Sequence, residues 1–478
     1  MAMTQHARTA RKAGTQPFRM SALELLRLYR RRELSPVEAM TSVIERVEAY
    51  EPHIHATFLY APERALSEAR ASEARWAKGE PIGPLDGVPV TIKDNIATRG
   101  DPKPVGTAAE DLTPQKADAP PAARLREAGA IMFTKTTMPD YGMLSSGLSS
   151  FHPLARNPWK LDRNPGGSSS GAGAAAAALY GPLHLGTDIG GSVRLPAGWC
   201  GIFGLKPSAG RIPIDPPYIG RVAGPMTRDV DDAALMMATL SLPDARDYTS
   251  LKYEKLDWIV EPAPLKGLRV GLLLEAGCGE TPKPEVRAAV ERAAKDFEAA
   301  GAHVEPLEPF LTQDMLDGLD RFWRARALND IRALTPERRA LILPFIRDWA
   351  ESAEGFSGVE VFRGFDRIPE MRKRAVAATA PFDYVLSPTA PMTAFPAEWA
   401  SPSRDPLKPF PQIGFTVPFN MSEQPAASVN CGYDSEGLPI GLQIVGRRFD
   451  DLGVLAVARA FEAIRAFEAR PWPEPPGA

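Results

Sequence analysis

The fold of this chain is decided by the stretch Asn164–Pro207, which reads NPGGSSSGAGAAAAALYGPLHLGTDIGGSVRLPAGWCGIFGLKP. It contains two Gly-Gly-Ser turns separated by an alanine-rich run. Each glycine in an ordered element costs backbone entropy, so this density is typical of a segment whose backbone N–H groups approach a ligand. We therefore interpret Ser192, in the second turn, as a nucleophile and Ser168, in the first turn, as its partner.

Size and composition indicate a large globular protein. The chain has 478 residues, of which 44% are hydrophobic and 24% are charged, enough for a sizeable core. Length alone predicts about three domains, but no linker or repeat divides the chain. We therefore expect a single large domain.

Charge and cysteine content bear on partners and compartment. A net charge of −3 gives no electrostatic reason to expect nucleic acid or an anionic membrane as a partner. The three cysteines, Cys200, Cys278 and Cys431, are far apart and lie in no metal-binding motif. This pattern favours a reducing compartment and argues against a disulfide scaffold or a zinc site.

The N-terminal segment 1–16 is polar and basic and has no apolar stretch of the secretory type. We expect it to be a disordered extension in front of a domain that covers 17–470. The chain also has no run of about 18 apolar residues that would form a transmembrane helix. These features predict a cytoplasmic protein with no membrane partner.

Strands and helices alternate along most of the chain, which predicts an α/β fold with helices on both faces of a central mixed, twisted sheet. Capping boxes at Ser21 and Ser35 begin two helices, and the region 311–379 is predicted as several aromatic-rich helices. Further helices are expected at 62–78, 120–128, 174–179, 193–199, 284–300 and 453–461. Strands are expected at 55–59, 88–95, 130–134, 268–274, 382–387, 427–431 and 438–444, and loops at 136–165 and 401–418.

The turn Gly190-Gly191-Ser192 meets two requirements of acyl-transfer chemistry, a nucleophile and donors for the developing oxyanion. Without side chains on the two glycines, consecutive N–H groups from Ile189 to Ser192 can converge on one point. A tight strand-to-helix turn, in which the glycines serve packing, accounts for this segment alone equally well.

The residues leave the identity of the general base open. His152 and His184 lie near the serine-rich segment in sequence, but neither sits in a catalytic motif. Lys93 is at the polar end of an apolar strand, and it can act as a base only if burial or nearby positive charge lowers its pKa. An ordinary surface lysine at a strand end fits the same pattern.

Three motifs in order resemble the amidase signature family: GVPVTIKDN at 87–95, PGGSSSG at 165–171 and GTDIGGSVR at 186–194. The sequences GLKP at 204–207, GRIP at 210–213 and GLPIGLQ at 437–443 continue the pattern. The resemblance extends from about 21 to 461. It implies the amidase signature fold and the hydrolysis of carbon–nitrogen bonds other than peptide bonds, in linear amides.

The same resemblance assigns roles to individual residues. It implies that Lys93 is the neutral base, that Ser192 forms an acyl-enzyme, and that Ser168, after a cis peptide bond from Gly167, relays the proton between them. It implies no metal and no cofactor. The remaining implied site residues are the oxyanion and substrate-binding group Ile189, Gly190, Gly191 and Gly142, and the supporting residues Ser169, Asp188, Arg194 and Gly167.

The substrate is expected to contact the loop 138–151 and the helices of 311–379. Their aromatic and aliphatic content predicts an apolar or aryl amide, an anilide or a carbamate, with esterase side activity. On this interpretation the partner is a small-molecule substrate and nucleic acid is not involved. The sequence does not give the oligomeric state, but a homodimer is possible, as is common among relatives.

Two other functions are considered. The glutamine-hydrolysing A subunit of an aminoacyl-tRNA amidotransferase shares the three catalytic residues. It usually carries Asp-Glu-Phe and a glutamine after the arginine, where this chain has Pro139-Asp140-Tyr141 and Leu195. The chain also lacks the glycine commonly found before Gln424-Pro425. A non-catalytic binding protein on this fold is the other alternative, and the three intact catalytic positions argue against it.

Overall fold

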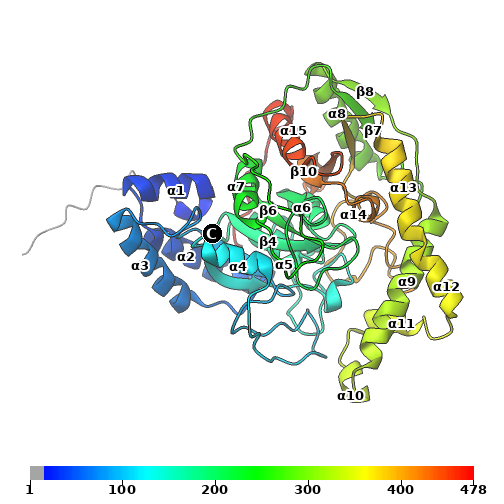
Figure 1. Cartoon of the computed structure of the whole chain (residues 1–478), viewed down its shortest axis with the longest axis horizontal. Helices are drawn as coiled ribbons and strands as arrows, with labels where there is room; N and C mark the ends of the chain where they lie inside the picture. Colours follow the sequence, from blue (N-terminus) through cyan, green and yellow to red (C-terminus); the bar gives the residue numbers. More distant parts are fainter. Residues whose placement is uncertain (1–15, 478) are drawn as a thin grey trace, which may run out of the picture.

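The computed structural model describes residues 16–477. Apart from Gln16, the predicted N-terminal extension lies outside the described residues. The described chain forms a single α/β domain (Figure 1).

The described residues form these strands: β1 (Thr57–Phe58), β2 (Pro89–Lys93), β3 (Ile131–Thr136), β4 (Leu183–Asp188), β5 (Phe203–Lys206), β6 (Val222–Thr227), β7 (Arg269–Leu272), β8 (His303–Pro306), β9 (Tyr384–Pro388), β10 (Ala426–Tyr433) and β11 (Pro439–Val445). They join in one 11-stranded sheet of order β1-β3-β2-β4-β6-β5-β10-β11-β9-β7-β8. The sheet is mixed, because β2 runs parallel to β3 and β4 whereas β10 and β11 form an antiparallel hairpin.

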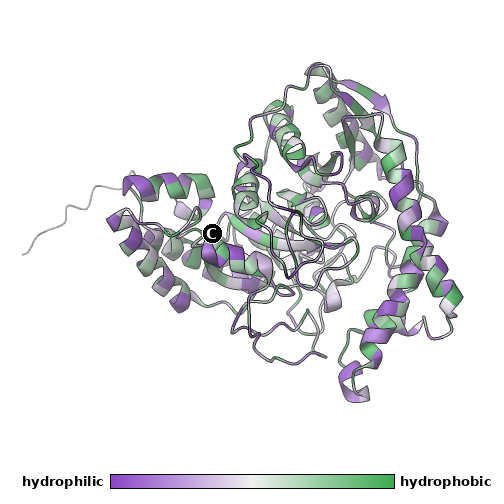
Figure 2. Cartoon of the chain, viewed as in Figure 1, coloured by the Kyte–Doolittle hydropathy of each residue, from purple (hydrophilic) through white to green (hydrophobic). Residues whose placement is uncertain are grey.

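The helices that cover the sheet have these bounds: η1 (Pro17–Arg19), α1 (Ala22–Arg31), α2 (Pro36–Ile54), α3 (Pro62–Lys78), α4 (Pro120–Glu127), η2 (Asp140–Gly142), α5 (Ser170–Ala177), α6 (Arg194–Cys200), α7 (Val230–Leu240), α8 (Pro284–Ala299), α9 (Gln313–Arg332), α10 (Pro336–Arg339), α11 (Pro344–Glu351), α12 (Gly358–Phe365), α13 (Arg367–Thr379), α14 (Val417–Met421) and α15 (Asp451–Ile464). Helices α1–α3 lie at one end of the molecule, and α9–α13 lie along the opposite side (Figure 1). Both groups carry alternating hydrophilic and hydrophobic residues (Figure 2), as expected of helices that bury one face.

The parallel pairing of β2 with β4 positions the catalytic segments. Ile92 lies opposite Leu185 in this ladder, so the two strands end at the same edge of the sheet. Lys93 is the last residue of β2, and the second Gly-Gly-Ser turn follows Asp188 at the end of β4. The topology therefore brings two motifs that are far apart in sequence to one place.

The alanine-rich run forms α5, which is buried along its whole length and packs against α6 and β4. A Cβ atom on Gly171 would lie 2.2 Å from the carbonyl oxygen of Ala56, so backbone approaches the helix closely there. Gly173 faces Pro196 in a similar way. Part of the glycine density that we attributed to ligand binding therefore serves helix packing.

Most expected elements are present. Both capping boxes form, and α3 has the predicted bounds. The expected strand over 55–59 is reduced to Thr57–Phe58, because α2 continues to Ile54 and His55 adopts a left-handed backbone conformation with a φ of 50°.

Two expectations from composition can be checked among the described residues. Cys200, Cys278 and Cys431 are buried free thiols, so no disulfide forms within residues 16–477. No helix in the same range is long and apolar enough to cross a bilayer.

Candidate active site

The amine of Lys93 lies at the centre of a cluster of hydroxyl groups. Its side chain is fully buried, and Nζ donates to Ser168 Oγ at 2.8 Å, to Ser169 Oγ at 3.0 Å and to Thr187 Oγ1 at 2.9 Å. These three partners are neutral, so no carboxylate among the described residues pairs directly with the amine. The structure thus removes the interpretation of Lys93 as a surface lysine.

Burial lowers the pKa of Lys93 from 10.5 to about 7. The negative charges of Asp188 and Asp94 oppose this shift, and the positive charge of Arg221 adds to it. Desolvation penalises the charged form of a buried amine when no direct ion pair compensates it. The neutral, basic form of Lys93 is therefore well populated near neutral pH.

Ser168 lies between this amine and the second turn. The peptide bond from Gly167 to Ser168 is cis, as the resemblance implied. The two turns are joined through the backbone, where Ser169 N–H donates to the carbonyl of Ser192 at 3.2 Å. Among residues 16–477, however, no hydrogen bond links the Ser168 and Ser192 hydroxyls, so the relay role of Ser168 stays a prediction.

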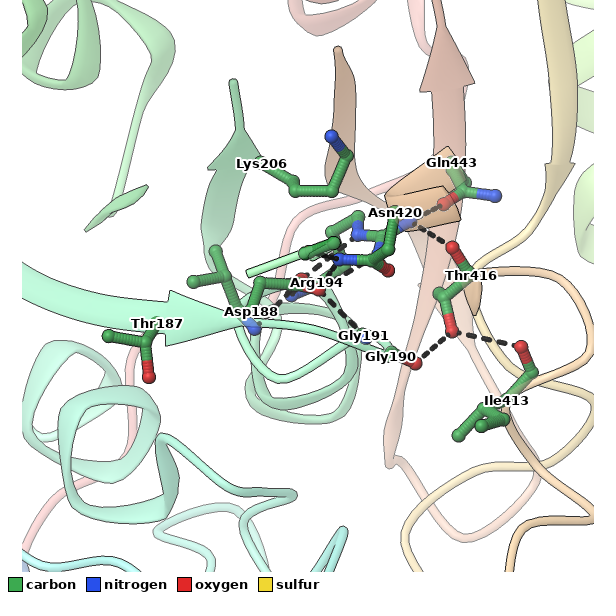
Figure 3. A network of polar contacts seen from close by, with 12 residues as sticks. Thr187, Asp188, Gly190, Gly191, Arg194, Lys206, Ile413, Thr416, Asn420 and Gln443 are labelled. Atoms are coloured by element: carbon green, nitrogen blue, oxygen red, sulfur yellow. Dashed lines mark hydrogen bonds and ion pairs between the residues drawn. The ribbon is translucent and has the colours of Figure 1, made fainter. Parts of the chain in front are cut away.

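The carboxylate of Asp188 fixes the backbone of the second turn. It accepts hydrogen bonds from Gly191 N–H at 2.8 Å and Val193 N–H at 3.0 Å. It also forms a fully buried ion pair with Arg194, whose Nη2 lies 2.9 Å from Oδ1 (Figure 3). The predicted supporting residues Asp188 and Arg194 are therefore in direct contact with the turn that carries Ser192.

Arg194 connects this turn to the C-terminal part of the chain (Figure 3). Its Nη1 donates to Gln443 Oε1 at 2.7 Å and to the carbonyl of Thr416 at 2.9 Å, and its Nη2 donates to Asn420 Oδ1 at 2.6 Å. Thr416 Oγ1 in turn donates to the carbonyl of Gly190 at 2.6 Å. The turn that carries Ser192 is thus held from strand β11 as well as from β4.

Burial alone would raise the pKa of Asp188, but the charge and hydrogen bonds of Arg194, with further bonds from Asn420 and Val193 N–H, hold that pKa well below its usual range. Asp188 is therefore ionised under all ordinary conditions. A permanently charged, fully bonded carboxylate suits a structural support and does not suit a general base.

The backbone donors available for an oxyanion differ from our expectation in one position. The N–H groups of Ile189, Gly190 and Ser192 have no acceptor within the described part of the chain. Gly191 N–H, in contrast, already donates to Asp188. The prediction that Gly191 contributes a donor is therefore wrong for this geometry, because the buried carboxylate takes its N–H.

Gly142 lies directly against Ser168. It has a φ of +70°, and a Cβ atom added to it would lie 3.1 Å from Ser168 Oγ and 3.2 Å from Met138 Cε. The resemblance placed Gly142 at the substrate, and this role stays a prediction. A larger residue at this position would crowd the Ser168 hydroxyl.

Gly142→Ala is expected to lower kcat by about 10-fold or more, because a misplacement of a reacting group by about 1 Å can cost 100-fold. Steady-state kinetics on any accepted amide would measure this, together with a thermal melt. Gly100→Ala is the matched control, since Gly100 also has a positive φ, of 89°, but open space around its Cβ position. Equal kinetic losses in both variants would contradict the proposed contact.

The histidines near the serine-rich segment do not reach the catalytic serines. His184 Nδ1 lies 2.9 Å from Thr91 Oγ1, and its Nε2 contacts the carbonyl of Gly181. Burial, with the charge of Arg228, lowers the pKa of His184 to about 3. His152 Nε2 lies 2.9 Å from Asp94 Oδ2. Both rings therefore have structural partners, and Lys93 is the base candidate that touches a catalytic serine.

A pocket opens above Ser192 and encloses about 420 Å³ including its solvent-filled mouth. Its walls come from the loop after β3, from the nucleophile turn, from α9 and from the segment before α14. They comprise Gly142, Met143, Leu144, Ser145, Ile189, Gly190, Ser192, Trp323, Arg326, Phe410 and Ile413.

Sequence reasoning missed three contributions to the site. Thr187 lies within the motif at 186–194, but it was not assigned the contact with Lys93 that the structure shows. Phe410 and Ile413 lie in no motif and outside the two regions expected at the substrate, so only tertiary packing brings them to the pocket. Trp323 and Arg326 come from α9, within the predicted region 311–379.

Comparison with known proteins identifies the family. The family profile described as Amidase matches residues 38–455. The chain belongs to the amidase signature family. A crystal structure of a bacterial aryl acylamidase from this family covers 93% of the chain and 96% of its own, with a TM-score of 0.85 and 31% sequence identity. The family assignment confirms the predicted α/β fold and the general class of amide hydrolase.

Other members of the amidase signature family are similar over their whole length. The A subunit of glutamyl-tRNA(Gln) amidotransferase from Moorella thermoacetica is 36% identical over 490 residues, covering 94% of this chain and 98% of the relative. The equivalent protein of Myxococcus xanthus is 34% identical and covers 95% and 99%. The structure of 6-aminohexanoate cyclic dimer hydrolase has a TM-score of 0.83 and 27% identity, covering 95% of this chain and 98% of that one.

These relatives correct one expectation. We predicted a small-molecule amide, anilide or carbamate as partner, no nucleic acid and a possible homodimer. The curated relatives are named as the A subunit of an enzyme for glutamyl-tRNA(Gln), that is, as part of an assembly that acts on a nucleic acid. The net charge of −3 gave no sign of a nucleic-acid partner. One protein of an assembly can take part in a tRNA-linked reaction without a basic surface of its own.

Proposed function

We propose that the chain hydrolyses a carboxamide through an acyl-enzyme on Ser192, with Lys93 as base and Ser168 as relay. The observation that carries this proposal is the contact at 2.8 Å between Ser168 Oγ and the buried amine of Lys93, whose pKa burial lowers to about 7. A hydroxyl can donate and accept at the same time, so Ser168 can take a proton from Ser192 and pass it to the amine.

In the first step Ser192 Oγ attacks the amide carbonyl, and its proton moves through Ser168 to Lys93. The N–H groups of Ile189, Gly190 and Ser192 stabilise the developing oxyanion. The proton then returns to the leaving nitrogen as the C–N bond breaks. Water hydrolyses the ester on Ser192 by the same path in reverse.

Within this class we propose the glutamine-hydrolysing role of an amidotransferase A subunit as the first candidate. It is supported by the similarity to the A subunit of glutamyl-tRNA(Gln) amidotransferase over nearly the whole of both chains. In this role the leaving group is ammonia, and the protein acts together with partner subunits and a charged tRNA. The departures at Pro139-Asp140-Tyr141 and Leu195 lie in the loop and helix beside the site.

A second candidate is supported by the pocket. Ile189, Trp323, Phe410 and Ile413 give it an apolar wall, and its lining within residues 16–477 contains no carboxylate that could bind the ammonium group of glutamine. This lining favours an apolar or aryl acyl group, and the similar aryl acylamidase structure is consistent with it. We propose that the helices α9–α13 form the substrate side of the pocket in either case, since Trp323 and Arg326 come from α9.

The two candidates predict different leaving groups. In the amidotransferase role, the chain should release ammonia from glutamine, and the rate should rise when the other subunits of an amidotransferase and glutamyl-tRNA are added. As an apolar-amide hydrolase, it should cleave acyl anilides alone and at a higher kcat/KM than glutamine. Ammonia and aniline release are measured on the same preparation, with Ser192 acylation followed by mass spectrometry. Acylation by neither substrate class would contradict the proposed mechanism.

A further inference from the structure

Arg326 brings a positive charge into the pocket that contains Ser192. Its guanidinium carbon lies 4.6 Å from the centre of the Tyr218 ring, and Nη2 reaches Met143 Sδ at 4.0 Å. Its Nε is buried and has no hydrogen-bond partner within residues 16–477. In the same range Arg326 forms no ion pair, although most arginines that face a protein interior are paired with a carboxylate.

Arg221 is a second arginine beside Tyr218, and its backbone N–H donates to the carbonyl of Tyr218 at 3.0 Å. It lies at the end of the loop that carries Tyr218, and its side chain donates to the carbonyl of Pro216. Burial and the nearby charge of Arg326 lower the pKa of Arg221. The carboxylates of Asp215 and Asp247 act on it only at longer range, because no ion pair to Arg221 forms among the described residues.

The hydroxyl of Tyr218 is a further unpaired donor at this place. It is buried and has no hydrogen-bond partner in the described part of the chain. A buried polar group without a partner costs free energy comparable to a lost hydrogen bond, and such groups in native proteins call for an explanation. Arg326 thus lines the pocket that contains Ser192, the Tyr218 ring against it carries a hydroxyl without a partner among the described residues, and Arg221 adds a second positive charge next to Tyr218.

We propose that Arg326, Arg221 and Tyr218 form a site for a carboxylate carried by the substrate itself, at a distance from the scissile amide. The inference rests on the proposed amide hydrolysis at Ser192 and adds the class of amide, one that bears an anionic group. Guanidinium groups bind carboxylates through charge-assisted hydrogen bonds, which are stronger than bonds between neutral groups. A bound carboxylate would also offset the repulsion between the two arginines.

The test uses isosteric pairs of amides. Glutaric monoamide carries a carboxylate at the end of its acyl chain, and 5-methylhexanamide carries an isopropyl group at the same position. The hexanoyl amides of 4-aminobenzoate and of 4-isopropylaniline place the same difference on the leaving amine. Wild-type protein should prefer the carboxylated member of one pair in kcat/KM. The pair that shows this preference also identifies whether the arginines bind the acyl side or the amine side of the substrate.

Arg326→Met should lower this preference by about 10- to 100-fold, the range expected when charged hydrogen bonds are lost. The loss should appear mainly in KM, and Arg326→Lys should restore part of it because it keeps the charge. Arg332→Met is the matched control, since Arg332 lies on the same helix and pairs with Glu354 at the surface. If Arg326→Met does not fold, Tyr218→Phe should give a smaller loss in the same preference.

Equal kcat/KM values within both pairs for wild-type protein, or an unchanged preference in folded Arg326→Met, would overturn the inference. Acylation of Ser192 by the neutral amides distinguishes a failure of the carboxylate site from a failure of the proposed amide hydrolysis. If acylation occurs, only the carboxylate site fails. If no amide acylates Ser192, the proposed function itself fails.

Discussion

Ser192→Ala is expected to lower kcat/KM for any accepted amide by about 10⁴-fold or more, because removal of a catalytic nucleophile costs up to about 10⁶-fold. Ser192 lies in the turn that supplies the free backbone donors, and alanine leaves no oxygen there to acylate. The measurement is ammonia or amine release, with mass spectrometry of the intact protein after rapid quenching. Wild-type protein should show the mass of the acyl group, and the variant should not.

Ser170→Ala is the matched control for this substitution. Ser170 belongs to the same serine run, but its hydroxyl donates to the carbonyl of Thr137 at 3.2 Å and does not contact Lys93. This variant should lose about 1 kcal/mol of stability and keep the acyl-enzyme. An acyl adduct on the Ser192→Ala protein, or its loss in Ser170→Ala alone, would contradict the assignment of the nucleophile.

Lys93→Met is expected to lower kcat/KM by about 10²- to 10⁴-fold, the usual contribution of a general base. The pH profile provides a second readout. Because the pKa of Lys93 is lowered to about 7, the active neutral amine is the minor form below this pH and the major form above it. Wild-type kcat/KM should therefore rise by about 10-fold per pH unit below pH 7 and level off above it. Lys93→Met should lose this inflection.

Lys135 offers a control of the same kind. It is also buried, burial lowers its pKa to about 8, and it lies on the neighbouring strand β3. Its Nζ donates to the carbonyl of Ile96 at 2.6 Å and to Thr98, and so it does not touch the serines. Lys135→Met should lower stability and leave the inflection near pH 7 in place. An inflection that survives in Lys93→Met and disappears in Lys135→Met would transfer the role of base to Lys135.

Local signals account for the parts of the fold that could be predicted from sequence. The capping boxes at Ser21 and Ser35 predicted where their helices begin, because the contacts of a capping box lie within a few residues. The strands β4, β5 and β6 were not predicted individually. Their residues are buried on both faces of the sheet, so they lack the alternating pattern that marks a half-exposed strand.

The residues of the candidate site likewise differ in whether they could be predicted from sequence. Lys93, Ser168 and Ser192 each lie within a short, uninterrupted motif. The resemblance could therefore assign their roles from sequence alone. Thr416, Asn420 and Arg326 make contacts across more than 100 residues of sequence, and no pattern in one sequence encodes such pairing. The donor from Gly191 was assigned wrongly, since the direction of one N–H group depends on the side chain of Asp188.

The network around Arg194 makes the turn of Ser192 depend on the last part of the chain to be synthesised. The nucleophile turn is held in part by Thr416, Asn420 and Gln443, which lie more than 220 residues further along. Contacts across such long loops form slowly because closing the loop costs entropy first. A nascent chain that has completed its first strands already carries Lys93 and both serines, yet it lacks the contacts that hold the turn of Ser192. If Ser192 acts as proposed, we expect such an unfinished chain to be inactive until its last strands have joined the sheet.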